Sequence, residues 1–467
     1  MEPLLASPRQ WRRGPGGGAA GAAGGATLER AAGLAGSEPA DLRRIPAVPS
    51  ESVPLGAPRP GSALAEERDR PAPDPWYCAY PFLVAQINPG GRVHACCANW
   101  VREDPGCYGR IAERPLRNVW NDERARRFRR SVVDGSYRYC KLDDCPLYRD
   151  PGSDIRSYAG GRYGAVLERF LRDEEAPIEP VDFFLQYDTT CNLSCPSCRS
   201  GVHVARGEEL ADVAAIQSHV FDGSGRPRKI TLCGSGEALA SPVLRSLLVD
   251  YAALGLEGCQ VALLTNGTLL DEPTYRRLSA APWIEEINVS IDAARPETYE
   301  LVRRGASWGT LRRNLAFYSR LLAAGRIRVF AASFTLQARN FRELYDFFDL
   351  CDEVGVTAIR VSTLVPCGEL GLPDAYRAHA VHLPAHPDFP ELCEVLGADR
   401  FEGQPTAYYS GALEAIHRDP AEYARRWLAR HAAELDADLR RLQPPPARPA
   451  RRESAARAPE GGCRAPR

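Results

Sequence analysis

The pattern of apolar and polar residues divides the chain into a patterned middle and two ends that lack a pattern. Residues 1–75 and 441–467 are rich in Ala, Gly, Pro and Arg and hold few large apolar side chains. Such segments cannot bury enough apolar surface to offset chain entropy, so we predict that both ends are disordered. The folded part is expected between these two ends.

From residue 181 to residue 370, short apolar runs alternate with longer amphipathic stretches. The runs predict six strands, at 182–188, 229–233, 260–265, 286–291, 328–336 and 357–364. The stretches between them predict helices near 208–220, 242–254, 308–323 and 341–354. This alternation indicates a parallel sheet covered by helices, that is, a partial (β/α)6 barrel in the α/β class. Functional groups are then expected at the carboxyl ends of the strands.

The segment 76–150 has a different pattern and predicts a small domain of its own. An apolar run over 82–87 turns at Asn88-Pro89-Gly90-Gly91 and returns over 92–97, which is typical of a β-hairpin. A basic helix follows, with Arg124, Arg126, Arg127, Arg129 and Arg130. We expect these charges to face solvent, and the alternative is a docking face for an anionic partner.

Two further segments complete the predicted organisation. Residues 151–180 form a connector with one helix from Ala165 to Arg172, stopped at Pro177. Residues 371–440 form a helical extension, with helices at 411–418 and 420–440 that would cover the open side of the barrel.

Composition narrows the classes of function and compartment. The 467 residues leave room for two or three domains, and a net charge of −1 gives no reason to expect a nucleic-acid partner. No apolar run reaches the length of a membrane span, and no secretory segment is evident. The 15 cysteines are then better explained by metal ligation than by disulfides. We predict a protein of the reducing cytoplasm.

Three cysteines directly after the first predicted strand are the clearest chemical signal. Cys191, Cys195 and Cys198 are spaced Cys-x3-Cys-x2-Cys. A loop with this spacing can place three thiolates on three corners of one metal–sulfur cube and leave the fourth iron without a protein ligand. A zinc knuckle or buried structural thiols are the alternatives, although three ligands and an open position suit a catalytic site better.

This triplet, following a strand in an α/β region, resembles the radical S-adenosylmethionine (radical SAM) family. The resemblance implies a [4Fe–4S] cluster whose open iron binds the amino and carboxylate groups of S-adenosylmethionine. It also implies that the cluster's electron cleaves the sulfonium to a 5′-deoxyadenosyl radical.

Motifs after the later strands resemble the S-adenosylmethionine contacts of the same family. Gly234, Gly236 and Glu237 resemble its Gly-Gly-Glu-Pro motif, although Ser235 is inserted and Ala238 replaces the proline. The resemblance also implies cofactor contacts from Asn266, Ser290 and Arg303. A strand-to-helix turn, a helix cap and a surface ion pair are the plain structural alternatives. Ser197 stands where an aromatic residue often stacks on the adenine, so Tyr187 or the last strand would have to replace it.

The segment 76–150 resembles the SPASM or twitch type of auxiliary-cluster domain. The likeness rests on the cysteines, on Gly109-Arg110-Ile111 and on Leu116-x-x-Val-Trp-Asn. It implies one auxiliary [4Fe–4S] cluster held by Cys78, Cys96, Cys140 and Cys145, with Cys97 as a competing ligand. The domain departs from the family in preceding the barrel and in its Cys-x4-Cys terminal pair. A zinc site is the alternative, because four cysteines on a hairpin and a knuckle would also suit zinc.

The resemblance implies hydrogen abstraction from a peptide or protein substrate, with the auxiliary cluster assisting oxidation or substrate binding. A reductant of the flavodoxin or ferredoxin type is implied as a partner. Oxidation or epimerisation of a carbohydrate or another small natural product is the first alternative. A non-catalytic zinc or iron–sulfur binding module is the second. Two more cysteines, Cys233 and Cys367, lie at predicted strand ends, as bystanders or as thiols that quench a substrate radical.

Overall fold

The structure, a computed structural model, describes residues 78–98, 100–111, 114–142, 145, 164–222, 226–232, 234–402, 407–429 and 431. The chain forms two compact units, of which the first ends at Arg418 and the second begins at Asp419. In the second unit, residues 420–429 are helical. The disorder predicted for 1–75 and 441–467 concerns residues outside the described ones.

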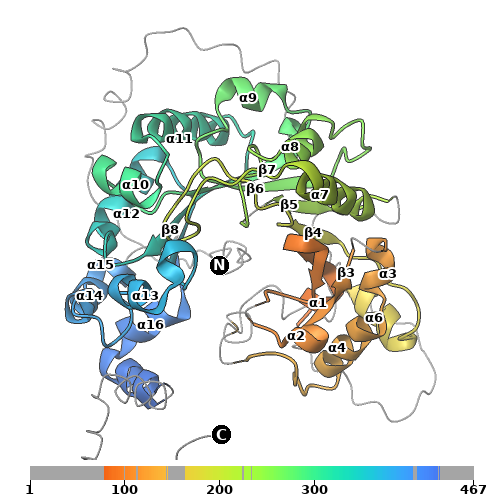
Figure 1. Ribbon diagram of the computed structural model, residues 1–467, viewed down its shortest axis with the longest axis horizontal. Coiled ribbons are helices and arrows are strands. Elements are labelled where there is room, and N and C mark those ends of the chain that lie inside the picture. Colours follow the sequence, from red (N-terminus) through yellow and green to blue (C-terminus); the bar gives the residue numbers. More distant parts are fainter. Residues whose placement is uncertain are drawn as a thin grey trace, which may run out of the picture. The chain divides into compact units, whose positions relative to one another are not determined.

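The first unit is built on one mixed sheet whose ten described strands run in the order β10-β9-β8-β7-β6-β5-β4-β1-β2-β3 (Figure 1). Their bounds are β1 Val84–Asn88, β2 Arg92–His94, β3 Cys107–Arg110, β4 Asp182–Leu185, β5 Lys229–Leu232, β6 Gln260–Thr265, β7 Ile284–Ser290, β8 Val329–Leu336, β9 Ala358–Thr363 and β10 Ala407–Tyr409. Strands β4 to β9 are parallel to their neighbours, which confirms the predicted α/β core.

In the barrel region, helices alternate with the parallel strands along the chain. They are α7 Gly207–Val220, α8 Pro242–Val249, α9 Glu272–Arg277, α10 Pro296–Val302, α11 Trp308–Ala323 and α12 Leu344–Val354. Local signals fix their ends: the Ser241 hydroxyl accepts from the N–H of Leu244 at the start of α8, and Gly355 ends α12 in the left-handed conformation. The short helices α9 and α10 were not predicted from the sequence.

The two faces of this sheet differ in chemistry because successive side chains point to opposite sides. One face is apolar and lies under the helices: Phe330 meets Tyr318 of α11 and Phe334 meets Phe347 of α12, with ring centroids 5.8 and 4.8 Å apart. Figure 1 shows α7, α8 and α11 on this outer side of the curved sheet. The opposite, concave face carries polar side chains from β5, β7, β8 and β9, namely Lys229, Thr231, Glu286, Asn288, Ser290, Ser333, Thr335, Arg360 and Ser362.

The cysteine-rich N-terminal segment shares this sheet. Its predicted hairpin is present as β1 and β2, which pair antiparallel, and β1 also pairs with β4 in parallel. The first residues of the predicted strand 82–87 belong instead to a single helical turn, because Pro81 is well suited to the start of a helix. The other elements here are α1 Tyr80–Leu83, η3 Pro89–Gly91, α2 Glu103–Gly106, α3 Leu116–Trp120, α4 Glu123–Val133 and α6 Gly164–Arg172.

The basic helix α4 corrects one part of the sequence prediction. Four of its arginines form ion pairs with acidic side chains, at 3.8 Å or less, and these are Arg124, Arg126, Arg127 and Arg130. Arg129 is only 1% exposed, so the prediction that it faces solvent is wrong. The reason is helical spacing: Arg129 falls on the same stripe as the buried residues Ala125, Phe128 and Val132.

The segment after β9 contains more structure than two helices. It includes η6 Gly368–Gly371, α13 Pro373–His379, α14 Phe389–Leu396, α15 Asp399–Glu402 and α16 Gly411–Arg418. Strand β10 lies between the last two helices and extends the parallel sheet beyond β9. The predicted helix at 411–418 is therefore confirmed, and β10 was not predicted. Within the described residues, no helix is both long and apolar enough to cross a membrane.

Candidate active site

The three cysteines of the triplet lie on one loop, residues 191–199, that follows the carboxyl end of β4. Cys191 forms an isolated antiparallel bridge with His203, and the carbonyl of Cys195 accepts from the N–H groups of Cys198 and Arg199. All three thiols are free of disulfides. The loop is therefore shaped by backbone hydrogen bonds at both of its ends, and we call it the cluster loop.

Each of the three sulfurs has a hydrogen-bond donor or a cationic side chain acting on it. The Leu193 N–H is 3.5 Å from Cys191 Sγ, and Arg199 Nη2 is 3.7 Å from Cys198 Sγ. The positive charge of Arg303 acts on Cys195 and favours its thiolate. Burial raises the pKa values of Cys191 and Cys195, while donors of this kind favour the thiolates that an iron–sulfur cluster needs.

Arg199 is a site residue that the sequence did not reveal. Its guanidinium donates to the carbonyls of Thr189 and Ser235, both at 2.7 Å, as well as to Cys198. It thus ties the cluster loop to the turn after β5. The signal available in the sequence was only a basic residue directly after the third cysteine.

The turn after β5 approaches the cluster loop closely, as its glycines imply. A Cβ on Gly236 would lie 2.3 Å from the carbonyl oxygen of Thr190, and Gly234 has a φ of 66°. The N–H of Glu237 donates to the same Thr190 oxygen at 2.7 Å. Only glycine permits this contact, since any side chain at residue 236 would push the two segments apart.

The predicted cofactor residues Glu237 and Asn266 contact each other and the cluster loop. The Glu237 carboxylate is 2% exposed and accepts from the hydroxyl of Thr265 and the N–H of Asn266. Burial raises the pKa of Glu237, whereas these hydrogen bonds favour its ionised form. The Asn266 amide donates to Asn192 Oδ1 at 2.9 Å and lies 3.9 Å from Cys191 Sγ. The structure therefore brings both residues to the base of the loop.

Arg303 forms a buried ion pair with Asp292. Arg303 Nη2 is 2.6 Å from Asp292 Oδ2, and both side chains are largely buried. Burial alone would lower the pKa of Arg303, but the negative charges of Asp292 and Cys195 raise it above its ordinary value. Asp292 has a φ of 62°, a left-handed conformation that Asp and Asn tolerate better than most residues. The Arg303 Nε atom has no hydrogen-bond partner among the described residues.

A second segment, residues 367–370, follows β9 and contacts the cluster loop. Gly368 has a φ of 59°, and a Cβ there would lie 2.3 Å from the backbone nitrogen of Arg199. Cys367 Sγ is 3.3 Å from the carbonyl oxygen of Cys198, to which it donates. Glu369 pairs with Arg304, whose Nε donates to Ser194 of the loop at 3.1 Å. Residues 367–370 are referred to below as the clasp.

Three other predicted positions are less closely tied to the loop. Ser290 ends β7 on the concave face, beside Ser333 in the register. The Tyr187 hydroxyl donates to Gln217 of α7 at 2.9 Å. Cys233 lies outside the described residues.

The four cysteines predicted to hold the auxiliary cluster line one cavity in the N-terminal segment. Cys78, Cys96, Cys140 and Cys145 all contribute to its wall, together with apolar side chains that include Trp100, Phe128 and Val132. Burial raises the pKa of Cys96, and nearby charge on Cys78 and Cys145 raises it further. Cys97 is buried but is not part of the cavity wall. This geometry favours the predicted set of four.

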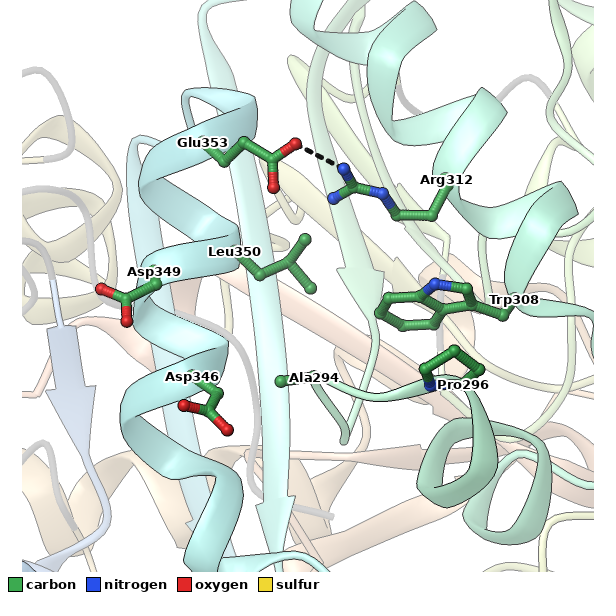
Figure 2. Close-up of a pocket in the computed structure, with 8 residues that line it drawn as sticks. All are labelled: Ala294, Pro296, Trp308, Arg312, Asp346, Asp349, Leu350 and Glu353. Carbon is green, nitrogen blue, oxygen red and sulfur yellow. Dashed lines mark hydrogen bonds and ion pairs between the residues drawn. The ribbon is translucent and has the colours of Figure 1, made fainter.

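A hollow on the outer surface lies apart from these two sites. Figure 2 shows it between α11 and α12, with Trp308 and Arg312 facing Leu350 and Glu353. Its carboxylates all form ion pairs: Glu353 with Arg312, Asp346 with Arg295, and Asp349 with Arg400. None of the predicted site residues lines this hollow, and its charges are already balanced.

Comparison with known proteins identifies the two cysteine-bearing regions. Residues 188–351 match the radical SAM superfamily, and residues 78–146 match SPASM, an iron–sulfur cluster-binding domain. An AdoMet-dependent heme synthase of Methanosarcina barkeri is 35% identical over 181 residues, which cover 38% of this chain and 49% of that protein. A probable GTP 3′,8-cyclase of Methanothermobacter thermautotrophicus is 26% identical over 231 residues, covering 48% of this chain and 72% of that protein. The chain thus spans about half the length of the heme synthase that it matches.

Solved structures with a detectable likeness include SuiB of Streptococcus suis bound to the precursor peptide SuiA. That likeness has a TM-score of 0.37 and 13% identity, and it covers 63% of this chain and 64% of SuiB. A second is anSMEcpe with bound AdoMet, with a TM-score of 0.32, 17% identity, and coverage of 48% of this chain and 60% of that one.

The residues present fit the cofactors that these two domains imply, a [4Fe–4S] cluster with S-adenosylmethionine and an auxiliary cluster. Soft thiolates are the donors that such clusters use, and the cluster loop offers three while the cavity offers four. In the described part of the chain, no group of three or more His, Cys, Asp or Glu side chains gathers as it would around a single metal ion. A metal–sulfur cube holds its ligand sulfurs farther apart than one ion does.

The order of the two regions, with the four-cysteine cavity ahead of the three-cysteine loop, is the order that the sequence predicted. The chain carries a region that matches the radical SAM superfamily, preceded by a SPASM domain.

Proposed function

We propose that this protein is an enzyme that reductively cleaves S-adenosylmethionine and uses the 5′-deoxyadenosyl radical to abstract hydrogen from a substrate. When bound, the cluster supplies the electron for that cleavage. The observation that supports the proposal best is that Cys191 and Cys198 each accept from a separate donor, while the charge of Arg303 acts on Cys195. Hydrogen bonds and charges beside the sulfurs tune the potential of an iron–sulfur cluster.

The other residues of the loop have positioning roles in this proposal. Gly236 and Glu237 hold the loop against the turn after β5, and Asn266 holds it against the turn after β6. Arg303 supplies a guanidinium whose Nε remains available to a carboxylate, in line with the predicted contact to S-adenosylmethionine. Ser290 ends β7 on the same concave face as the polar side chains of β8 and β9.

We infer that the substrate is hydrophilic and lies against the concave face. Asn288 Oδ1 accepts from Ser333 at 2.7 Å, while its buried Nδ2 atom has no partner among the described residues and can donate to a bound molecule. Arg360 and Lys229 contact Glu286 at 3.3 Å, so the floor of this face is charged. A peptide or protein, modified by oxidation with help from the auxiliary cluster, is our first candidate.

A small molecule is the second candidate, and the curated relatives favour it. Two of the proteins that match part of the chain are named for heme synthesis and for cyclising GTP. A polar concave face suits a small hydrophilic substrate as well as a peptide. The two candidates differ in whether an extended chain must reach the site.

Anaerobic reconstitution of the full chain tests the proposal. We expect about eight irons per chain, and 5′-deoxyadenosine from S-adenosylmethionine once a reductant is added. Replacing Cys191, Cys195 and Cys198 by Ala together should remove 5′-deoxyadenosine and roughly half of the iron. The matched control is Cys367→Ala, which changes a thiol beside the same loop and should keep all of the iron.

Two results would count against the proposal that the protein is an enzyme. A chain that holds zinc in place of iron, or that forms no 5′-deoxyadenosine although both sites are loaded, would be a binding module. For the substrate, deuterium transfer into 5′-deoxyadenosine from labelled peptides or from labelled small polar molecules separates the two candidates.

A further inference from the structure

Arg129 is a buried cation without a counter-ion among the described residues. Its Nε donates to the carbonyl of Pro81 at 2.9 Å, whereas Nη2 has no hydrogen-bond partner in this part of the chain. The charges that act on it are those of Tyr108 and of another arginine, Arg126, and no carboxylate is among them. The other arginines predicted for this helix all have acidic partners.

Aromatic rings surround the guanidinium but carry no net negative charge. Its Cζ atom lies 4.6, 5.5 and 6.0 Å from the ring centroids of Trp120, Tyr108 and Phe82. Contacts of this kind stabilise a cation, but they do not supply the opposite charge that a buried ion ordinarily has beside it. Burial lowers the pKa of Arg129 to about 10, so the side chain is still charged at neutral pH.

The four-cysteine cavity, a place for a balancing anion, shares residues with the surroundings of Arg129. Pro81, which accepts from Arg129, is part of the cavity wall, and so are Phe128 and Val132 from the same helix. The cavity is therefore one residue layer away from the guanidinium. Four thiolates around an iron–sulfur cube form an anion, and reduction adds one more negative charge.

Tyr108 contacts Arg129 and is also affected by the charge of the cysteines. Its ring centroid is 5.5 Å from Arg129 Cζ, and its buried hydroxyl has no hydrogen-bond partner in the described structure. Burial raises the pKa of Tyr108; the charge of Arg129 opposes that rise, and charge on Cys96 and Cys140 adds to it. The phenol thus lies within electrostatic reach of both the guanidinium and the thiols.

We propose that Arg129, acting with Tyr108, is the fixed counter-charge of the auxiliary cluster and raises its reduction potential. This inference rests on the proposed loading of the four-cysteine cavity with a cluster. Arg129 touches neither substrate nor cluster, so it is a positioning residue. A positive charge held in a low-dielectric interior stabilises the more negative, reduced cluster. The auxiliary cluster is thereby made a better acceptor for an electron from a substrate radical.

The test is the potential of the auxiliary cluster in full chains whose Cys191, Cys195 and Cys198 are replaced by Ala. With the loop thiols gone, EPR-monitored redox titration reports the auxiliary cluster alone. Arg129→Met keeps an unbranched stem and removes the charge, so we expect a lower potential. The reduction equilibrium should fall at least tenfold, which is about 59 mV for one electron.

Three companion variants separate charge from structure. Arg129→Lys keeps the charge and should restore most of the potential. Arg126→Met, on the same helix, removes an arginine that already has a partner in Glu175 and should leave the potential unchanged. Tyr108→Phe keeps the ring and should lower the potential by less than Arg129→Met does.

The results that would overturn this inference are distinct from those that would overturn the proposed enzymatic function. An unchanged potential in Arg129→Met, or an equal shift in Arg126→Met, rules out the counter-charge role. If Arg129→Met fails to load iron, an unchanged potential in Tyr108→Phe also rules out the counter-charge role. A chain without iron in this cavity also refutes it, while formation of 5′-deoxyadenosine by the unmodified protein is measured separately.

Discussion

At the scale of single residues, the cluster loop depends on two close approaches and one buried ion pair. Gly236 and Gly368 let backbone from two other segments touch the loop, one at each end of it. Asp292 and Arg303 place opposite charges beside Cys195. These contacts make specific substitutions informative.

Replacing Gly236 by Ala should displace the cluster loop. The added Cβ would lie 2.3 Å from the Thr190 oxygen, which no real Cβ tolerates, so the turn after β5 must move. We expect a loss of stability of about 1–3 kcal/mol, as for other overpacked positions, together with lower iron content. Urea unfolding and iron analysis measure both.

The matched control is Gly201→Ala, a few residues past the same loop, where an added Cβ meets nothing within 4 Å. Equal losses in the two variants would show that the close approach at Gly236 is not what holds the loop.

Replacing Asp292 by Asn should be far more costly than breaking an ion pair on the surface. Asn fits the left-handed backbone and keeps the size of the side chain, but it leaves Arg303 charged and unpaired. We expect the free energy of unfolding to fall by about 3–5 kcal/mol. Arg295→Gln breaks the exposed pair with Asp346 and should cost less than about 1 kcal/mol. Comparable losses in denaturant unfolding would contradict the buried role of Asp292.

At the scale of elements, the hairpin of the SPASM segment is a part of the barrel's own sheet. The pairing of β1 with β4 aligns Ala85 with Phe183 and Ile87 with Leu185, and all four side chains are buried. Loss of this pairing would expose both edges, so the hairpin and the first barrel strand should not unfold separately.

Hydrogen exchange measures this coupling directly. We expect the amides of β1 and β4 to exchange through one opening with a common free energy, because each strand protects the other. The amides of helix α4, which is not in the sheet, serve as a reference. Exchange from β1 at a much lower opening free energy than from β4 would show that the two regions are independent units.

The elements that the sequence predicted well are those whose signal is local. The strand at 260–265 and the helix at 308–323 match β6 and α11 residue for residue, because each has a clear apolar period and clear ends. The strand β4 stops at Leu185, three residues before its predicted end, and residues 186–190 lead from it to the cluster loop. The pairing of β1 with β4 could not be predicted, since it joins residues about a hundred positions apart.

The features of the site also divide into those with a local signal in the sequence, which could be predicted, and those without one. Cysteine spacing was enough to select Cys191, Cys195 and Cys198, because ligand geometry is encoded within eight residues. The side chains that act on those sulfurs were harder to identify: the resemblance gives Arg303 as a cofactor contact, with a surface ion pair as the alternative, and Arg199 belongs to no motif. Arg129 looked like a solvent-facing charge because a run of arginines hides the one that falls on the buried stripe.

At the scale of the whole molecule, stability should fall in mild acid because of a buried histidine. His382 is 7% exposed, and burial together with nearby His386 lowers its pKa from 6.5 to about 4. Between these values the unfolded chain binds a proton that the folded chain does not. Stability is therefore complete above pH 6.5 and decreases as the pH falls toward 4.

Urea unfolding at pH 7.5 and at pH 5.5 checks this prediction. We expect His382 to account for about 1 kcal/mol of the difference between the two pH values, and His382→Asn should remove that part. His219→Asn, on the outer helix α7, is the comparison variant and should leave the difference as it is. If both variants behave alike, the buried imidazole does not set the acid response.

The strand order of the sheet has a consequence for how the protein is made. Apart from the β1–β4 junction, every described strand lies next to the strand that precedes it in the chain. As synthesis proceeds from the N-terminus, the hairpin emerges first and offers β1 as a template edge. Each later strand can then dock on a finished neighbour, with no need to wait for residues still inside the ribosome. The clasp at 367–370 emerges long after the cluster loop that it contacts, so the nascent loop is open to iron delivery until nearly the last strand is in place.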